Sequence, residues 1–247
     1  MKNSASGGAR WVDVAPERFP GWVASFPRRH GADSEDQSLT MAVTGDSVIF
    51  TAPDGAVAEC HLPFPPLPDN SKKRAADEAA RPAEVAEVAE VAEAVAAHAR
   101  RPRTVGVLLV RLGGYAAGVF TGYPPALADA KTGSRLVHGR SAAGGWSQHR
   151  FARRREKQAS EALQAAARAA ADVFGRRGAQ PGGTLDAVVF GGDKRAMAEL
   201  RQDPRLAPYL AIATDRFLTV PDPKRAVLEA TPRLFLAVRI RLTEPTP

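Results

Sequence analysis

A short loop that ends in a glutamine holds the residues of this chain whose types best fit a chemical role. Gly144 and Gly145 come first, and Gln148 follows three residues after the second glycine. The glutamine amide does not titrate near neutral pH, but it donates and accepts hydrogen bonds at once and can orient a water molecule. Paired glycines let a polymer approach the backbone closely, and exposed N–H groups there stabilise an oxyanion. The loop fits hydrolysis of an activated ester, and an ordinary flexible loop is the alternative interpretation.

Basic residues surround this loop. From Lys131 to Lys157 there are eight Lys or Arg and one acidic residue, Glu156, which gives a net charge of +7. The whole chain also carries +7, so its other segments together sum to zero. A local excess of this kind is typical of a surface that binds a polyanion.

A long helix is expected to start inside the basic segment, over Phe151–Phe174. Its first turns hold Arg150, Arg153, Arg154 and Lys157. The helix dipole disfavours cations at this end by a modest amount, and its repetition at four residues suggests that an external anion offsets the repulsion. Phosphates of RNA would do so. A solvated basic face is the alternative.

Three other kinds of site fit the sequence less well. Ser147 and His149 flank the glutamine, but neighbours in sequence rarely form a nucleophile–base pair, and there is no Gly-x-Ser-x-Gly elbow. Asp193, which follows two glycines, is better explained as a helix N-cap than as part of a phosphate loop. The five histidines lack metal-ligand spacing. We therefore expect neither a metal nor a cofactor.

Residues 103–247 are predicted to form an α/β domain. The expected strands are Thr104–Leu112, Tyr115–Thr121, Arg135–Ser141, Asp186–Phe190, Phe217–Val220 and Val238–Leu242. Besides Phe151–Phe174, which Gly175 should end, helices are expected at Lys194–Gln202 and Lys224–Ala230. Gly113-Gly114 suits a tight hairpin turn. Hairpin strands followed by alternating helices and strands predict a mixed sheet with flanking helices.

The first hundred residues divide into three parts. Residues 1–10 are expected to be a disordered tail, and residues 11–67 a small α+β unit with a helix at Pro16–Phe26 and strands at Leu39–Thr44, Ser47–Ala52 and Ala56–Leu62. Residues 68–102 contain Ala-Glu-Val three times. Because a period of three drifts around a helix of 3.6 residues per turn, we predict a solvated linker helix rather than a partner-binding one.

Composition narrows the class of protein. A hydrophobic content of 44% is enough for a core, and a pI near 10 favours nucleic acid or ribosome as a partner. A single cysteine, Cys60, excludes an internal disulfide and a Cys-rich zinc site. Neither a signal peptide nor an apolar run of about 20 residues is present. We expect a monomeric, soluble, cytoplasmic protein without membrane contact.

The loop and the helix start resemble known sequences. Gly144-Gly145 followed by Arg150-Phe151-Ala152-Arg153 is similar to the Gly-Gly-Gln loop and Arg-Phe-Ala-Arg helix start of eukaryotic and archaeal class-one release factors. The fuller run, from Lys131-Thr132-Gly133-Ser134-Arg135 through Gly139-Arg140-Ser141 to Arg155, resembles the actinobacterial Vms-type release-factor-like peptidyl-tRNA hydrolases. The resemblance covers about residues 100–247. It implies a release-factor catalytic domain with a ribonuclease-H-like fold, beside the small N-terminal unit.

The same resemblance implies a reaction and site residues. The implied activity is release of nascent chains from peptidyl-tRNA on stalled large ribosomal subunits, with ribosomal RNA and peptidyl-tRNA as partners. Aligned on Arg150-Phe151, Trp146 takes the place of the release-factor glutamine. Vms-type relatives also carry their glutamine at a shifted place in a Gly/Ser-rich loop, so the resemblance implies that Gln148 is the catalytic glutamine, with Gly144 and Gly145. Arg140 joins the basic residues of the helix start as an RNA contact, and Trp146 either stacks on a base or anchors the loop.

Two alternatives stay open at this point. One is an endonuclease that cleaves the tRNA acceptor 3′ end, a reaction associated with eukaryotic Vms-type relatives. The other is a ribosome- or RNA-binding factor without catalysis. An intact or truncated CCA end on the released tRNA separates the first from an esterase, and Gln148→Ala separates the second.

Overall fold

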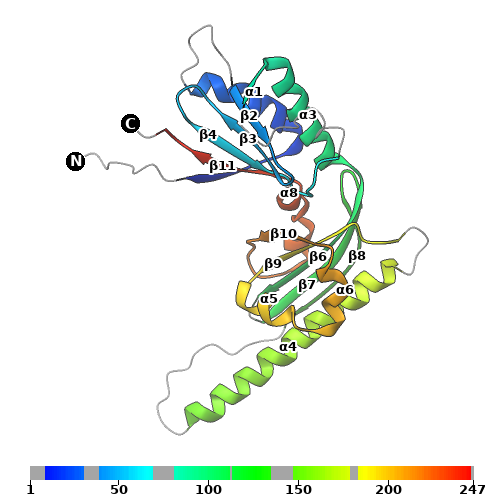
Figure 1. Cartoon of the computed structure of the whole chain (residues 1–247). Coiled ribbons are helices and arrows are strands. Elements are labelled where there is room, and N and C mark those ends of the chain that lie inside the picture. The colour runs from blue at the N-terminus through cyan, green and yellow to red at the C-terminus, as the bar shows by residue number, and fades with distance from the viewer. Residues whose placement is uncertain are drawn as a thin grey trace. The chain divides into compact units, whose positions relative to one another are not determined.

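The chain forms two compact units (Figure 1). The computed structural model describes residues 9–30, 39–68, 81–111, 113–134, 147–178 and 183–245, without the side chains of residues 81, 147–156 and 178. Unit 1 comprises Met1–Arg101 and Leu236–Pro247, and unit 2 comprises Pro102–Phe235. Unit 1 therefore takes both ends of the chain, and unit 2 is inserted between them.

A six-stranded antiparallel sheet is the framework of unit 1. Its strand order is β1 (Arg10–Val14), β11 (Val238–Thr243), β4 (Val57–His61), β3 (Ser47–Thr51), β2 (Leu39–Val43) and β5 (Arg81–Ala83). Successive side chains of a strand point to opposite faces, so Val238, Ile240 and Leu242 of β11 enter the core while the residues between them do not. The turn η1 (Pro16–Arg18) and helices α1 (Phe19–Arg29) and α3 (Val85–Arg100) complete the unit, with both helices packed into this core.

Strand β11 corrects the predicted domain division. We expected Val238–Leu242 to lie in the same domain as residues 103–235, but β11 pairs with β1 and β4 in unit 1. Strand β1, which we did not predict, pairs along its full length with β11. Pairing between strands at the two ends of a chain cannot be predicted from local sequence, because the hydrophobic pattern of a strand does not determine which strand pairs with it.

Helix α3 corrects the prediction of a solvated linker. Its buried residues are Val88, Val91, Ala92, Val95, Ala96, His98 and Ala99. Spacings of three and four define one helical face. The valines of the repeat do drift around the helix, but alanines occupy the buried face at the positions where valines no longer lie on it. The repeat therefore packs against α1 and the sheet, while Glu84, Glu90 and Glu93 stay exposed.

Unit 2 is built on the mixed sheet that we predicted. Its strand order is β10 (Ala213–Leu218), β9 (Ala187–Gly192), β6 (Arg103–Arg111), β7 (Gly114–Gly122) and β8 (Ala126–Ser134). Strands β6, β7 and β8 are antiparallel, whereas β9 runs parallel to β6 and β10 parallel to β9. The sheet therefore has three antiparallel strands, with two parallel strands added beside the first of them.

Helices cover both faces of this sheet. Successive residues of β7 point to opposite faces of the sheet. Ala117 and Val119 belong to the core shared with α4 (Ser147–Gly178), whereas a Cβ atom at Gly118 would meet Leu228 on the other face. The first face also carries α5 (Lys194–Leu200), η2 (Pro204–Leu206) and α6 (Ala207–Leu210). The second face carries α7 (Arg225–Glu229) and α8 (Pro232–Phe235), where Phe235 packs edge-on against Phe120 of β7.

Two boundaries in unit 2 differ from the prediction. The third strand of the antiparallel group is Ala126–Ser134, which we had not assigned, and the strand predicted at 135–141 lies outside the described residues. Helix α4 begins at Ser147 and continues to Gly178, so Gly175 lies inside it rather than ending it. A glycine within a helix costs only about 1 kcal/mol relative to alanine, which the packing of α4 offsets.

Candidate functional site

The start of α4 brings together five of the predicted site residues. Gln148 lies in its first turn, and Arg150, Arg153, Arg154 and Lys157 follow within the next turns. Positions separated by three and four residues share one face of a helix, so the four basic positions lie on one side of α4. No acidic residue is present in the first turn. In the structure, Gln148 and the basic residues thus lie together at a helix start, as predicted from the sequence. This arrangement suggested an anion as the ligand.

The remaining predicted site residues are not placed by the structure. Gly144, Gly145, Trp146 and Arg140 lie outside the described residues, as do the side chains of Gln148 and the three arginines. Their roles stay predictions. Of the side chains in the predicted set, that of Lys157 is described, and it is exposed.

Helix α4 carries Gln148 far from the core of unit 2. Its first buried residue among those described is Ala166, and none of the described side chains from Lys157 to Ala165 is buried. At 1.5 Å per residue, Gln148 lies about 27 Å along the helix from Ala166. Figure 1 shows the first part of α4 running beyond the sheet. Such a helix can present its start to a large partner while its second half stays fixed.

The second half of α4 is anchored by packing and by ion pairs. Phe174 is 1% exposed and meets the ring of Tyr209 edge-on, with 5.0 Å between ring centroids. Asp172 lies 3.1 Å from Lys131 Nζ, and Arg176 Nε donates to Asp129 Oδ2 over 2.9 Å. That hydrogen bond raises the pKa of Arg176. Both partner residues belong to β8, but all four side chains are substantially exposed, so these ion pairs contribute little and the burial of Phe174 is the main anchor.

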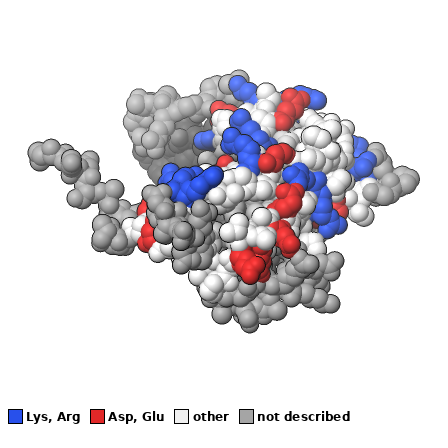
Figure 2. All heavy atoms as spheres, turned by 90° about the horizontal axis from the view of Figure 1, so that it is seen from above, with Lys and Arg blue, Asp and Glu red and all other residues white. Residues whose placement is uncertain are grey.

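Positive charge is concentrated in unit 2. Residues 102–235 hold 21 Lys or Arg and 11 Asp or Glu, whereas the rest of the chain holds 13 and 16. On the face shown in Figure 2, acidic and basic side chains are interspersed. The excess charge of the chain therefore belongs to the unit that carries α4, as expected for a unit that binds a polyanion.

Asp193 has the structural role that we predicted. Its side chain accepts a hydrogen bond of 2.9 Å from the backbone N–H of Ala196 and caps α5. Helix α5 has only seven residues. The interpretation of Gly191-Gly192-Asp193 as a helix N-cap is confirmed.

Other reactive groups give no second site. Burial, with a smaller contribution from Glu59, raises the pKa of the Cys60 thiol well above its usual range, so this thiol is not a nucleophile at neutral pH. Within the part of the chain that the structure describes, no three His, Cys, Asp or Glu side chains gather as they would around a metal ion.

A family model matches the domain that carries this helix. The model describes the Actinobacteria/Chloroflexi VLRF1 release factor, and it matches residues 103–241, more than half of the chain. The chain belongs to the Actinobacteria/Chloroflexi VLRF1 release factor family. The VLRF1 match spans β6 to β11, including all of α4, and so confirms the release-factor-like resemblance predicted from the sequence.

Solved structures with a weaker likeness to this chain include a translation termination factor. Archaeal translation termination factor aRF1 is 13% identical, with a TM-score of 0.38, over 94% of this chain and 68% of that chain. The Vms1 mitochondrial localization core is 9% identical, with a TM-score of 0.34, over 94% and 82%. Pelota from Archaeoglobus fulgidus is 10% identical, with a TM-score of 0.27, over 95% and 66%. Comparison with curated proteins gives no match. The family assignment rests on residues 103–241.

The VLRF1 chain has no membrane helix in its described part. Among residues 9–30, 39–68, 81–111, 113–134, 147–178 and 183–245, no helix combines the length and hydropathy needed to span a membrane.

Proposed function

We propose that this protein is a peptidyl-tRNA hydrolase that releases nascent chains from stalled large ribosomal subunits. The observation that carries the proposal is the position of Gln148 in the first turn of a basic helix, about 27 Å along the helix axis from Ala166, its first buried residue among those described. Membership of a release-factor family supports the reaction class. A catalytic group that must reach a buried ester inside a larger particle needs such an extended support.

The proposed chemistry is ester hydrolysis with the amide of Gln148 as the orienting group. A water oxygen attacks the peptidyl carbonyl carbon, the bond from that carbon to the 3′ ribose oxygen breaks, and the ribose oxygen takes a proton from the water. The products are a tRNA with an intact CCA end and a free peptide, whose new carboxyl group releases its proton to solvent. Because an amide does not titrate near neutral pH, Gln148 positions the water by hydrogen bonding, directly or through the terminal ribose hydroxyl.

The neighbouring residues have supporting roles in this proposal. Gly144 and Gly145 give the loop close access to the ester, and their backbone N–H groups hold the oxyanion. Arg150, Arg153, Arg154, Lys157 and Arg140 contact phosphates of ribosomal RNA or of the tRNA acceptor end. Trp146 stacks on a base. Proximity, rather than a strong base, supplies much of the acceleration.

Product analysis tests which bond is cut. Stalled large subunits carrying peptidyl-tRNA are incubated with the protein, and the tRNA 3′ end is sequenced. The proposal expects free peptide together with tRNA that ends in CCA. If peptide is released only together with a tRNA whose 3′ end is truncated, the protein is an endonuclease. If it binds the subunit tightly but releases no peptide, it is a binding factor.

A further inference from the structure

A groove of about 1050 Å³ runs along the middle of α4 in unit 2. Its walls come from α4 between Ala159 and Arg168, the β6–β7 hairpin, the end of β8 and the start of α5. Strands β6 and β9 are parallel and both end here, and ligands of α/β sheets commonly bind at the carboxyl ends of parallel strands. On α4, the described lining begins two residues beyond Lys157.

Tyr115 provides a flat surface in this groove. It pairs with Gly133 on the neighbouring strand β8. A Cβ atom at Gly133 would lie 2.5 Å from Tyr115 Cε1 and Cζ, so the ring lies across the glycine and takes the place of a side chain. Both residues line the groove, and Tyr115 is partly buried, packed against the core of unit 2. An aromatic ring that lies over a strand and lines a groove is a platform on which a nucleobase can stack.

Three arginines line the same groove. Arg111 is held by a hydrogen bond of 2.9 Å from its Nη1 to the carbonyl of Val220. Arg195 is paired with Glu199 only at 3.7 Å, and its side chain is 92% exposed, so this pair contributes little. Arg168 is exposed on α4. Guanidinium groups bind phosphate oxygens with two parallel hydrogen bonds.

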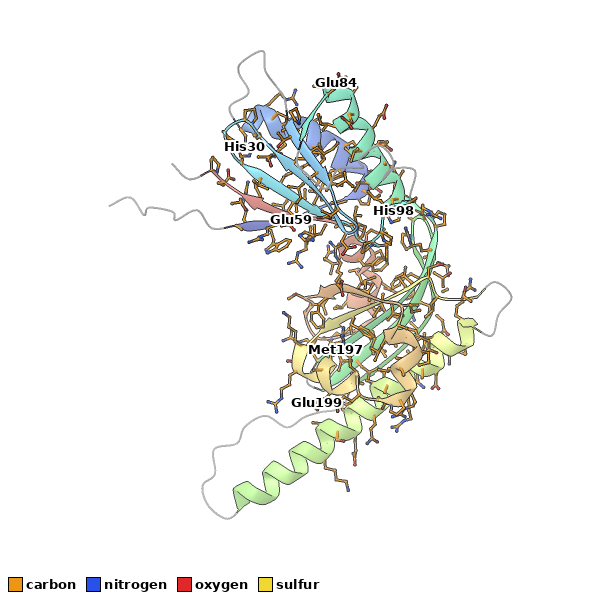
Figure 3. All side chains as sticks on the ribbon, viewed as in Figure 1. His30, Glu59, Glu84, His98, Met197 and Glu199 are labelled. Carbon is orange, nitrogen blue, oxygen red and sulfur yellow. The ribbon has the colours of Figure 1, made fainter. Side chains whose placement is uncertain are left out.

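Carboxylates lie among these arginines and narrow the choice of ligand. Glu161, Asp193 and Glu199 also line the groove, and Figure 3 shows Glu199 on α5. Carboxylates repel phosphates but accept hydrogen bonds from base amino groups and ribose hydroxyls. A duplex offers mainly its phosphates, whereas unpaired nucleotides offer base edges, ribose and a free base face. The mixed lining therefore favours a single strand.

We propose that this groove binds unpaired nucleotides of RNA, with a base stacked on Tyr115 and backbone phosphates at Arg168 and Arg195. The proposal rests on the proposed function only in taking RNA as the polyanion. Arg168 follows Gln148 by 20 residues, about 30 Å along α4. The groove is thus a second RNA contact, separate from the reacting ester.

RNA binding by the full-length protein tests this site. Anisotropy of a labelled single-stranded 12-nucleotide RNA is compared with that of a 12-base-pair RNA duplex. We expect the wild type to prefer the single strand, Tyr115→Ala to lower that affinity about ten-fold and to remove the preference, and Tyr115→Phe to restore both. Arg168→Gln should weaken binding, while Arg225→Gln, a matched exposed arginine outside the groove, should not.

The outcomes separate this site from the catalytic proposal. Equal single-strand affinities for wild type, Tyr115→Ala and Arg168→Gln overturn the groove proposal, as does a wild type that prefers the duplex. Arg168→Gln keeps the test valid if Tyr115→Ala fails to fold. Gln148→Ala should bind RNA normally. If it also releases peptide normally, the catalytic proposal fails while the groove proposal stands.

Discussion

The ring of Phe174 on α4 lies directly over Gly106 on β6. A Cβ atom at Gly106 would lie 3.0 Å from Phe174 Cε1 and 3.1 Å from Cζ, so a side chain there would push the ring away. Phe174 is buried in the core of unit 2. This contact anchors the second half of α4, whose other end carries Gln148.

Truncating this anchor should destabilise unit 2. Phe174→Ala leaves a cavity between α4 and β6, and we expect the free energy of unfolding to fall by about 3–5 kcal/mol. Urea denaturation followed by circular dichroism measures the loss. Gln148→Ala, on the same helix but outside the core, is the control and should leave the unfolding curve unchanged. A loss below about 1 kcal/mol for Phe174→Ala would mean that α4 is not anchored at this point.

Replacing a valine of α3 by alanine should affect stability differently at a buried and at an exposed position. Val95 is fully buried in unit 1, whereas Val85 is 69% exposed. We expect Val95→Ala to lower the free energy of unfolding by about 2 kcal/mol and Val85→Ala to change it by less than about 0.5 kcal/mol. Tryptophan fluorescence during urea denaturation reports the difference, since Trp22 packs on this core. Equal effects would contradict the burial of α3.

Neutralising the basic face of α4 should weaken subunit binding in a salt-dependent way. We expect Arg153→Gln/Arg154→Gln to lower affinity for the large ribosomal subunit at least about ten-fold and to reduce the slope of log K against log salt by about two. Arg28→Gln/Arg29→Gln, two adjacent arginines at the end of α1, is the matched control. Sedimentation at several salt concentrations gives both quantities. An unchanged slope would place the phosphate contacts elsewhere.

Acid should remove one local contribution to stability. The hydrogen bond from the Arg205 side chain to Asp203 holds the pKa of this carboxyl below its usual 3.8. A carboxyl whose pKa is lower in the folded than in the unfolded protein stabilises the fold at pH values above its unfolded-state pKa. This stabilisation is lost as the pH falls through its folded-state pKa. The stability difference between wild type and Asp203→Asn should therefore be constant above about pH 5 and shrink below about pH 4. Urea midpoints across this range measure it; a difference that grows on acidification would contradict the sign.

The sequence allowed prediction of elements with strong local patterns. The β6–β7 hairpin is one case, because two apolar runs flank Gly113 and Gly114. In the structure Arg111 pairs with Gly114, and Gly113 has a φ of +87°, so the turn lies one residue earlier than predicted. The capping role of Asp193 is another, since Ser, Thr, Asp and Asn at a helix start satisfy free backbone N–H groups.

Long-range pairing and packing were beyond such reasoning. Strand β11 pairs with β4, about 180 residues earlier in the chain, and with β1, about 230 residues earlier, and α3 gains its buried face only from the sheet and helix α1 of unit 1. The groove was missed for the same reason. Tyr115, Arg168 and Arg195 come from three separate elements, and no spacing in the sequence links them.

Peptide release by Gln148→Ala tests the central claim most directly. Rates are measured on stalled large subunits carrying peptidyl-tRNA, at protein concentrations that saturate both the wild type and the variant, so that binding does not limit either. We predict a rate at least about 100-fold lower for the variant, with unchanged subunit affinity and stability, because the water is no longer oriented. Equal rates for the two proteins would contradict the account and remove Gln148 from the mechanism.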